Sequence, residues 1–361
     1  MNCRLLYIIG QLGMGGSERQ LCALIGSIDR TRYQPAVAVW GNAPNDHYAP
    51  LIRALDVPVI KLGTRPTRLA KLKALRKLVS DLRPEVIHSY SLHTNLAAWW
   101  AALGTRAIPI GSVRAQFALE RRSAGIFGRL SGQWPSGQIY NSFNAEREAK
   151  HSTTIFKPRR IYVVTNGIDL DRFAPRPNPE RGYILAVGSM YARKRWDRLL
   201  RAVSHLAGNG FELEVLHVGS GPLREELETM ARGLHVEHMF RFLGNRHDIP
   251  DILAGAAFLV HTAENEGCPN AIMEAMACGR AVVATDAGDV PYLIDDGETG
   301  FVVPQEDEAA LADRIAILLN DRELCRRMGN AGRAKAEQLF GLDRLREETF
   351  SAYRDEGWED R

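Results

Sequence analysis

Hydrophobic and polar residues follow one another along this chain as short apolar runs separated by helical stretches. Apolar runs of four to eight residues, bounded by turn-forming residues, are typical of buried strands. The chain holds thirteen such runs, at 5–10, 35–40, 57–62, 85–88, 107–113, 137–142, 160–166, 183–189, 212–219, 239–244, 257–262, 281–285 and 300–304. Strands that alternate with helices predict parallel sheets with helices on both faces.

Thirteen strands are too many for one open sheet, and a length of 361 residues favours two domains. The stretch APRPNPERG at 174–182, rich in proline and charge, is the natural break between them. We therefore predict an α/β fold of two Rossmann-like, doubly wound domains that face each other across a cleft, at 1–173 and 174–340. The last helical stretch, within 341–361, is expected to return to the first domain. Ligands of such sheets bind at the carboxyl ends of the strands.

Composition indicates a globular protein of a reducing compartment. Hydrophobic residues make up 45% and charged residues 25%, and the five cysteines form no C-x-x-C pair. No apolar run approaches the roughly 18 residues that span a bilayer, and the start of the chain does not resemble a secretory signal. We expect a cytoplasmic protein.

Charge is distributed unevenly between the two halves. Residues 1–165 contain 23 Lys/Arg and 9 Asp/Glu, whereas the remaining residues contain 23 and 34. The stretch 65–84 alone has seven basic residues and one acidic residue, and further arginines of this half are Arg114, Arg121, Arg122 and Arg129. Such a half is expected to meet an anionic acceptor or an anionic membrane surface, with a solvated basic helix as the alternative. Nucleic acid is not expected, because no binding motif accompanies the charge.

Two strands run into glycine-rich turns that could approach a phosphate. The first turn has Gly13, Gly15 and Gly16 before a helix. The second has Gly219 and Gly221, with Pro222 as a candidate first helical residue. Neither completes G-x-G-x-x-G, so ordinary strand-to-helix turns remain an equal alternative.

The stretch NEGCPNAIMEAMACG at 265–279 places Glu266 and Glu274 eight positions apart, around a Gly/Pro kink that begins a helix. Backbone N–H groups at such a helix start suit an anion or a set of hydroxyls, and a carboxylate can accept hydrogen bonds from ribose hydroxyls. The alternative is a capped helix with a solvated glutamate on its surface.

Six blocks, in order, resemble the family 4 retaining glycosyltransferases, which have the GT-B fold and use nucleotide-activated sugars. The blocks are GMGGSERQL, TNGIDLDRF, GSMYARKRWDRLLRAV, HVGSGPLREELE, FLGNRHDIPDIL and the acidic-pair stretch read on through AVVATDAGDVPYLIDDGETGFVVP. They cover almost the whole chain.

The resemblance implies roles for individual residues. Glu266 would face the donor sugar, Glu274 would bind the ribose, and Lys194 would neutralise the donor diphosphate. The family usually has an arginine where this chain has Ser189, and Arg193 is a candidate replacement. The other residues implied at the donor are Gly15, Gly16, Arg246, Gly267, Cys268, Pro269 and Asn270.

Histidines near the fourth strand depart from the family pattern His-x-His. His88 matches the first histidine and Tyr90 replaces the second, whereas His93 resembles a histidine that a subset of the family keeps. We predict His93 rather than His88 as the residue at the reacting sugar, with a structural role for either as the alternative.

The resemblance implies transfer of a hexose-type sugar, with retention, from a UDP- or GDP-sugar to a saccharide or lipid-linked acceptor of cell-envelope polysaccharide or glycolipid synthesis. Asp169 and Asp171 form a D-x-D, but their place within TNGIDLDRF implies a structural role, so neither a metal nor another cofactor is expected. Two alternatives stay open: a sugar-nucleotide epimerase of similar shape, and a catalytically weak partner that binds sugar nucleotides. Ser189 and Tyr90 favour the second of these.

Overall fold

The computed structural model describes residues 4–42, 46–64, 67–114, 125–180 and 182–360. Within these ranges the chain forms two compact units. The first contains residues 1–167 and 342–361, and the second contains residues 168–341. The division falls before the proline-rich stretch at 174–182, because Ile168 and Phe173 are buried in a core of the second unit.

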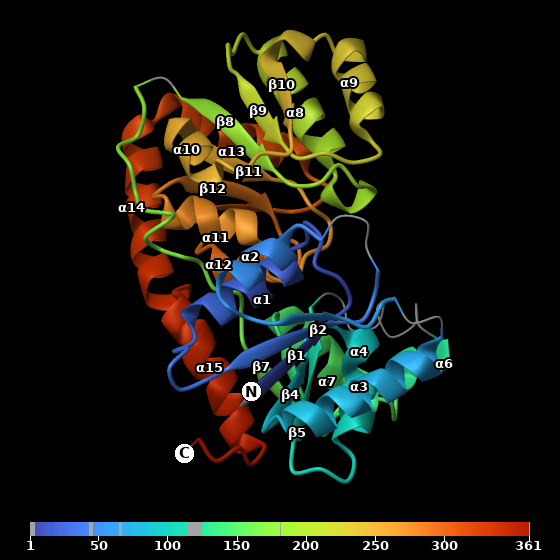
Figure 1. The fold of residues 1–361 in the computed structure, drawn as a ribbon. Helices are drawn as coiled ribbons and strands as arrows, with labels where there is room; N and C mark the ends of the chain where they lie inside the picture. The colour runs from blue at the N-terminus through green and yellow to red at the C-terminus, as the bar shows by residue number, and fades with distance from the viewer. Residues whose placement is uncertain (1–3, 43–45, 65–66, 115–124, 181, 361) are drawn as a thin grey trace. The chain divides into compact units, whose positions relative to one another are not determined.

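The first unit has a seven-stranded parallel sheet in the order β3-β2-β1-β4-β5-β6-β7 (Figure 1). Its strands are β1 (Leu5–Ile9), β2 (Pro35–Val39), β3 (Val59–Lys61), β4 (Val86–Ser89), β5 (Ile108–Val113), β6 (Gly137–Tyr140) and β7 (Arg160–Val163). Its helices are α1 (Gly16–Ser27), α2 (Tyr48–Ala54), α3 (Arg68–Leu82), α4 (Leu92–Ala102), α6 (Gly125–Gln133), α7 (Phe143–His151) and α15 (Leu342–Asp355).

The second unit has a six-stranded parallel sheet in the order β10-β9-β8-β11-β12-β13 (Figure 1). Its strands are β8 (Tyr183–Val187), β9 (Val215–Val218), β10 (Phe240–Gly244), β11 (Ala256–His261), β12 (Ala281–Thr285) and β13 (Gly300–Val303). Its helical segments are η1 (Ala192–Lys194), α8 (Trp196–Gly208), α9 (Arg224–Gly233), η2 (Glu237–Met239), α10 (Ile249–Gly255), α11 (Asn270–Ala277), α12 (Val290–Leu293), α13 (Glu308–Asn320) and α14 (Arg322–Leu339).

Each sheet buries both of its faces, as the apolar runs predicted. In β1, Tyr7 belongs to one core cluster of the first unit, whereas Leu6 and Ile8 belong to another. In β8, Ile184 and Leu185 divide in the same way between the two clusters of the second unit. Successive side chains of a strand point to opposite faces, so a run buried on both faces has no polar alternation. All thirteen predicted strands are confirmed.

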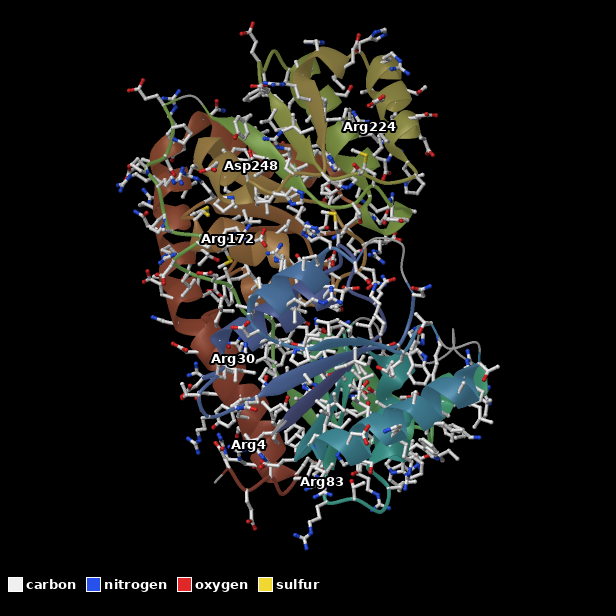
Figure 2. All side chains as sticks on the ribbon, in the orientation of Figure 1. Arg4, Arg30, Arg83, Arg172, Arg224 and Asp248 are labelled. Carbon is white, nitrogen blue, oxygen red and sulfur yellow. The ribbon has the colours of Figure 1, made fainter. Side chains whose placement is uncertain are left out.

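The last helix belongs to the first unit and is held there by charge as well as by packing. Helix α15 contacts α1, and Phe350 and Tyr353 lie in the same core cluster as β1. Just beyond α15, Asp360 lies 3.6 Å from the guanidinium of Arg4, which also pairs with Glu85 at 2.8 Å (Figure 2). The end of the chain is thereby fixed to the start of β1.

Helix α3 buries one narrow apolar face and leaves some of its leucines exposed. Leu75 and Val79 are buried, whereas Leu69 is 59% exposed. Two of its cations bind backbone carbonyls, Lys71 that of Trp40 and Arg76 those of Trp100 and Leu103. These two cations keep their charge but are held against the backbone of the first unit. Arg65, Arg121 and Arg122 lie outside the described residues.

Candidate functional site

The glycine-rich turn after β9 is shaped by contact with the loop after β8. Gly219 has φ of +138°, and a Cβ at this position would overlap the carbonyl oxygen of Gly188. A Cβ at Gly221 would meet the carbonyl oxygen of Met190 at 2.5 Å. The two loops are also joined by a hydrogen bond from the Met190 N–H to the carbonyl of Ser220, at 3.0 Å. Close backbone packing therefore requires both glycines, which favours the turn-forming alternative for this motif.

The helix after this turn begins later than predicted. Helix α9 starts at Arg224, and Pro222 precedes it. The backbone N–H of Leu223 donates to the carbonyl of Met190 at 3.2 Å, so this segment is a turn bound to the β8 loop.

Lys194 lies in η1, on the loop between β8 and α8. Its backbone is joined to the loop after β11, because the Thr262 hydroxyl donates to the Lys194 carbonyl at 3.0 Å. The N–H of Glu264 donates to the carbonyl of Arg193 at the same distance. Strands β8 and β11 are neighbours in the sheet, so these bonds join two adjacent carboxyl ends. The Lys194 ammonium thereby reaches the carboxylate of Glu266 and forms an ion pair with it.

Glu266 is ionised over the whole physiological range. Its side chain is 15% exposed, and Nε2 of the buried His261 lies 3.4 Å from Oε1. Burial raises the pKa of Glu266, but the adjacent His261 and the charge of Lys194 outweigh burial and lower the pKa to about 2. Burial also lowers the pKa of His261, so this imidazole is neutral near pH 7. A carboxylate with such a pKa accepts hydrogen bonds and has no proton to donate.

The loop after β12 supports the backbone around Glu266. Gly288 has φ of +57°, and a Cβ there would overlap the carbonyl oxygen of Glu266. The N–H of Asp289 donates to the carbonyl of Gly267 at 3.2 Å. The position of Glu266 thus depends on three consecutive strand ends of one sheet, those of β8, β11 and β12.

Helix α11 begins directly after the kink that holds Glu266. Pro269 is its N-cap and has an extended backbone, with φ of −72° and ψ of 108°. Cys268 and Pro269 are buried, whereas Gly267 and Asn270 are partly exposed at the helix start. Glu274 lies in the helix and is 2% exposed, which excludes the solvated surface glutamate of the alternative interpretation.

The other residues expected at the donor lie in more exposed places. The Arg193 side chain is exposed, as in the solvated-loop interpretation. Arg246, in the loop after β10, forms an exposed ion pair with Asp248 at 2.6 Å (Figure 2). Ser189 uses its backbone carbonyl to accept a hydrogen bond from the indole of Trp196 at 3.0 Å.

In the first unit, Gly15 is the N-cap of α1 and Gly16 its first residue. The carboxylate of Glu18 folds back over this start, and a Cβ at Gly15 would overlap it. Burial raises the pKa of Glu18, although its own N–H and Gln11 oppose this. Because these atoms are the flexible end of the Glu18 side chain, and Gly15 has φ of −96°, the contact alone does not require a glycine here.

The two histidines near β4 differ completely in environment. His88 is 1% exposed, and both ring nitrogens are bound, Nδ1 to the Tyr353 hydroxyl at 2.6 Å and Nε2 to the Ser112 hydroxyl at 2.8 Å. His93 lies in the first turn of α4 and is exposed. His88 therefore has the structural role, and only His93 is available to a ligand.

Asp169 closes a turn, because its carboxylate accepts a hydrogen bond from the N–H of Arg172 at 3.0 Å. Among the residues that the structure describes, no group of three or more His, Cys, Asp or Glu is arranged to hold a metal ion. In the same residues, no helix combines the length and apolar character needed to cross a membrane.

Sequence reasoning missed three residues of this site: His261, Gly288 and Asp289. His261 is a polar residue within an otherwise apolar strand. Gly288 and Asp289 lie in the turn-forming sequence DAGDVP. These sequence features indicate an unusual polar position and a turn, but they do not show that either one contacts Glu266.

Comparison with known proteins places both units in glycosyltransferase families. Residues 14–172 match the family described as Glycosyltransferase Family 4, and residues 167–335 match Glycosyl transferases group 1. An uncharacterised glycosyltransferase of Haemophilus influenzae is 28% identical over 95% of this chain and 97% of its own length. The N-acetyl-alpha-D-glucosaminyl L-malate synthase of Bacillus anthracis is 30% identical over 40% of this chain, and the match spans only 38% of that enzyme.

The solved structure of HepE from Anabaena, in complex with UDP-glucose, has the same fold. It superposes with a TM-score of 0.84 and 18% identity, covering 97% of this chain and 99% of its own.

Proposed function

Because the chain belongs to glycosyltransferase family 4, we propose that it transfers a hexose-type sugar from a nucleoside diphosphate sugar to an acceptor hydroxyl. One observation carries this proposal: Lys194 and Glu266 are paired where the N-terminus of α11 begins, and Glu274 lies within that helix. A cation beside backbone N–H groups suits a diphosphate, and carboxylates suit the hydroxyls of a sugar and a ribose.

In this proposal the ion pair is the resting arrangement of the donor site. A bound diphosphate shares the charge of Lys194, and Glu266 accepts a hydrogen bond from a sugar hydroxyl. Since the pKa of Glu266 is about 2, Glu266 orients the sugar and is not a general acid. Lys194 stabilises the negative charge that develops on the leaving diphosphate. Glu274 binds the ribose, and the backbone from Gly267 to Asn270 contributes hydrogen bonds to the sugar.

We further propose retention at the anomeric carbon without a protein nucleophile. The leaving diphosphate takes the proton of the acceptor hydroxyl on the face from which it departs, and no metal is required. Support comes from the family membership and from Glu266, whose carboxylate is ionised and paired with Lys194 and so is not poised as a nucleophile. His93, exposed at the start of α4, is the candidate contact from the first unit.

UDP-sugars are the first donors to test, since the Anabaena neighbour is solved with UDP-glucose, and GDP-sugars are the alternative. The basic charge of the first half supports a saccharide or lipid-linked acceptor of envelope polysaccharide or glycolipid synthesis. It also supports activity of the enzyme at the cytoplasmic membrane surface. A catalytically weak sugar-nucleotide-binding partner is the second candidate, because Ser189 and the buried Tyr90 replace residues that the family usually has.

Thermal unfolding with a panel of UDP-, GDP-, ADP- and TDP-sugars tests the donor site. We expect one nucleotide class to stabilise the wild type, and Glu274→Gln and Glu274→Ala to weaken its binding about 10- to 100-fold. Glu226→Ala, an exposed glutamate of α9, is the matched control and should bind as the wild type does. If the Glu274 variants bound the nucleotide sugar as tightly as the wild type, the site assignment would be overturned. Binding without turnover, over a broad acceptor screen, would favour the weak partner.

A further inference from the structure

Arg114 is a partly buried cation at the carboxyl end of the first sheet, and no residue that the structure describes gives it a counter-charge. It directly follows β5, and its Nε and Nη1 atoms are buried. Within the described part of the chain, neither atom has a hydrogen-bond acceptor, and no carboxylate pairs with the guanidinium. An unpaired charge of this kind costs stability, so its presence requires an explanation.

Two described groups beside Arg114, Tyr90 and His88, are neutral: burial raises the pKa of Tyr90, although the charge of Arg114 and a hydrogen bond from it act against burial. The guanidinium carbon of Arg114 lies 4.0 Å from the ring centroid of Tyr90, which is 0% exposed and directly follows β4. Burial lowers the pKa of His88, and the charge of Arg114 lowers it further, with no carboxylate acting against them. Both nitrogens of His88 are already bound, so this residue cannot accept a bond from Arg114.

A third strand end and the start of a helix lie beside Arg114. Asn141 directly follows β6, and its N–H donates to the carbonyl of Val113 at 3.3 Å, next to Arg114. Asn141 is 5% exposed, and its Oδ1 atom has no hydrogen-bond partner in the described residues. Helix α7 begins two residues later. The ends of β4, β5 and β6 thus form one polar position in a parallel sheet, where ligands of such sheets bind.

We propose that Arg114 binds an oxyanion, a phosphate or a carboxylate, that the sugar acceptor carries. The planar guanidinium matches both groups, and Arg114 is only partly buried, so an anion can reach it from the sheet end. The identification of the anion with the acceptor rests on the proposed function, whereas binding of an anion at Arg114 does not. The acceptor would then be an acidic saccharide or a phosphorylated carrier.

The test measures thermal unfolding of the full chain while inorganic phosphate or acetate replaces chloride at constant ionic strength. All variants carry Lys194→Met, which removes the cation proposed for the donor diphosphate. Arg114→Gln is compared with Arg106→Gln. Arg106 is the matched control, since it is exposed and lies before β5, at the opposite end of the same strand. The difference between the two variants cancels the general stabilisation that phosphate gives proteins.

We expect the anion to raise the melting temperature of the Arg106→Gln variant by roughly 1–3 °C more than that of Arg114→Gln. A stronger response to phosphate than to acetate would assign a phosphorylated acceptor, and the reverse would assign a uronic or other carboxylic acid. Equal responses of the two variants would overturn the proposal.

Stability in chloride provides the second readout. Without ligand, Arg114→Gln should be at least as stable as the Lys194→Met parent, because it removes an unpaired charge. Arg114→Lys should fold and retain part of the anion response. A marked loss of stability in both variants would show that Arg114 is a structural residue and would overturn the assignment. Nucleotide-sugar binding is measured separately in the Lys194 wild type, so failure here leaves the donor site untouched.

Discussion

The carboxyl ends of the two sheets differ in whether their charged side chains are paired with an opposite charge. In the second unit, Lys194 and Glu266 compensate each other, and His261 contacts the same carboxylate. In the first unit, Arg114 lies over Tyr90 among neutral groups that are bonded to one another. A paired cation and carboxylate are stable without a ligand, and a ligand that binds either group must rearrange the pair. An unpaired cation can bind an anion directly, but without the anion it lowers the stability of the protein.

The largest effect is expected from breaking the pair. Lys194→Met leaves the Glu266 carboxylate without its cation, and we expect the free energy of unfolding of the second unit to fall by about 3–5 kcal/mol. Transfer should also lose about 100- to 1000-fold in kcat/KM, because the leaving diphosphate loses its charge stabilisation. Chemical denaturation and steady-state kinetics measure the two effects.

The double variant Lys194→Met/Glu266→Gln should recover most of the lost stability, since it removes both charges, but none of the activity. Arg193→Met, an exposed neighbour, is the control for stability. If Lys194→Met were as stable as the wild type, the pair would not compensate charge, and the contrast with Arg114 would disappear.

A smaller effect is expected from the backbone that supports Glu266. Gly288→Ala places a Cβ against the Glu266 carbonyl in a left-handed conformation, which should cost about 3 kcal/mol of stability. Gly297 also has positive φ, at +80°, but a Cβ there meets nothing within 4 Å, so Gly297→Ala should cost only about 1 kcal/mol. If Gly288→Ala and Gly297→Ala lost the same free energy of unfolding, the cost at Gly288 would come from backbone conformation alone and not from contact with the Glu266 carbonyl.

Acid should weaken the second unit through Glu266. Its pKa is about 2 in the folded protein and near 4.5 in the unfolded chain, so its contribution is complete above pH 4.5 and is lost as the pH falls toward 2. Wild type should therefore lose up to about 3 kcal/mol more than Glu266→Gln between pH 5 and 2. Parallel stability curves of the two proteins would contradict this.

The smallest effect is expected from the neutral network of the first unit. Tyr353→Phe removes the hydroxyl that binds His88, at a cost of about 1–2 kcal/mol. Tyr191→Phe, at an exposed tyrosine, should change stability by less than about 0.5 kcal/mol. A loss as small as that of Tyr191→Phe would mean that the hydrogen bond to His88 does not stabilise the first unit.

Local pattern was sufficient for the strands. Motif resemblance singled out Lys194, Glu266 and Glu274, which the structure places at and near the start of α11, and their roles toward a donor stay a prediction. The same reasoning did not find His261, because its contact with Glu266 exists only where the loop after β11 turns back over its own strand. It also did not connect Gly288 with Glu266, since that contact depends on β11 and β12 being neighbours in the sheet. Pro222 was expected to begin a helix, and packing against the β8 loop made it part of a turn.

By itself, the sequence determined the thirteen strands, the division into two parallel sheets and the family, because burial on both faces and motif order are properties of local segments. Only the tertiary structure decided which charges are paired. Lys194 and Glu266 meet because β8 and β11 are adjacent, although 72 positions separate them in the chain. In the first unit, folding bound His88 on both sides, left His93 exposed, and placed Arg114 over the neutral ring of Tyr90, with Nε and Nη1 lacking an acceptor among the described residues. The energy of a charge depends on its neighbours and its burial, and strand order sets both.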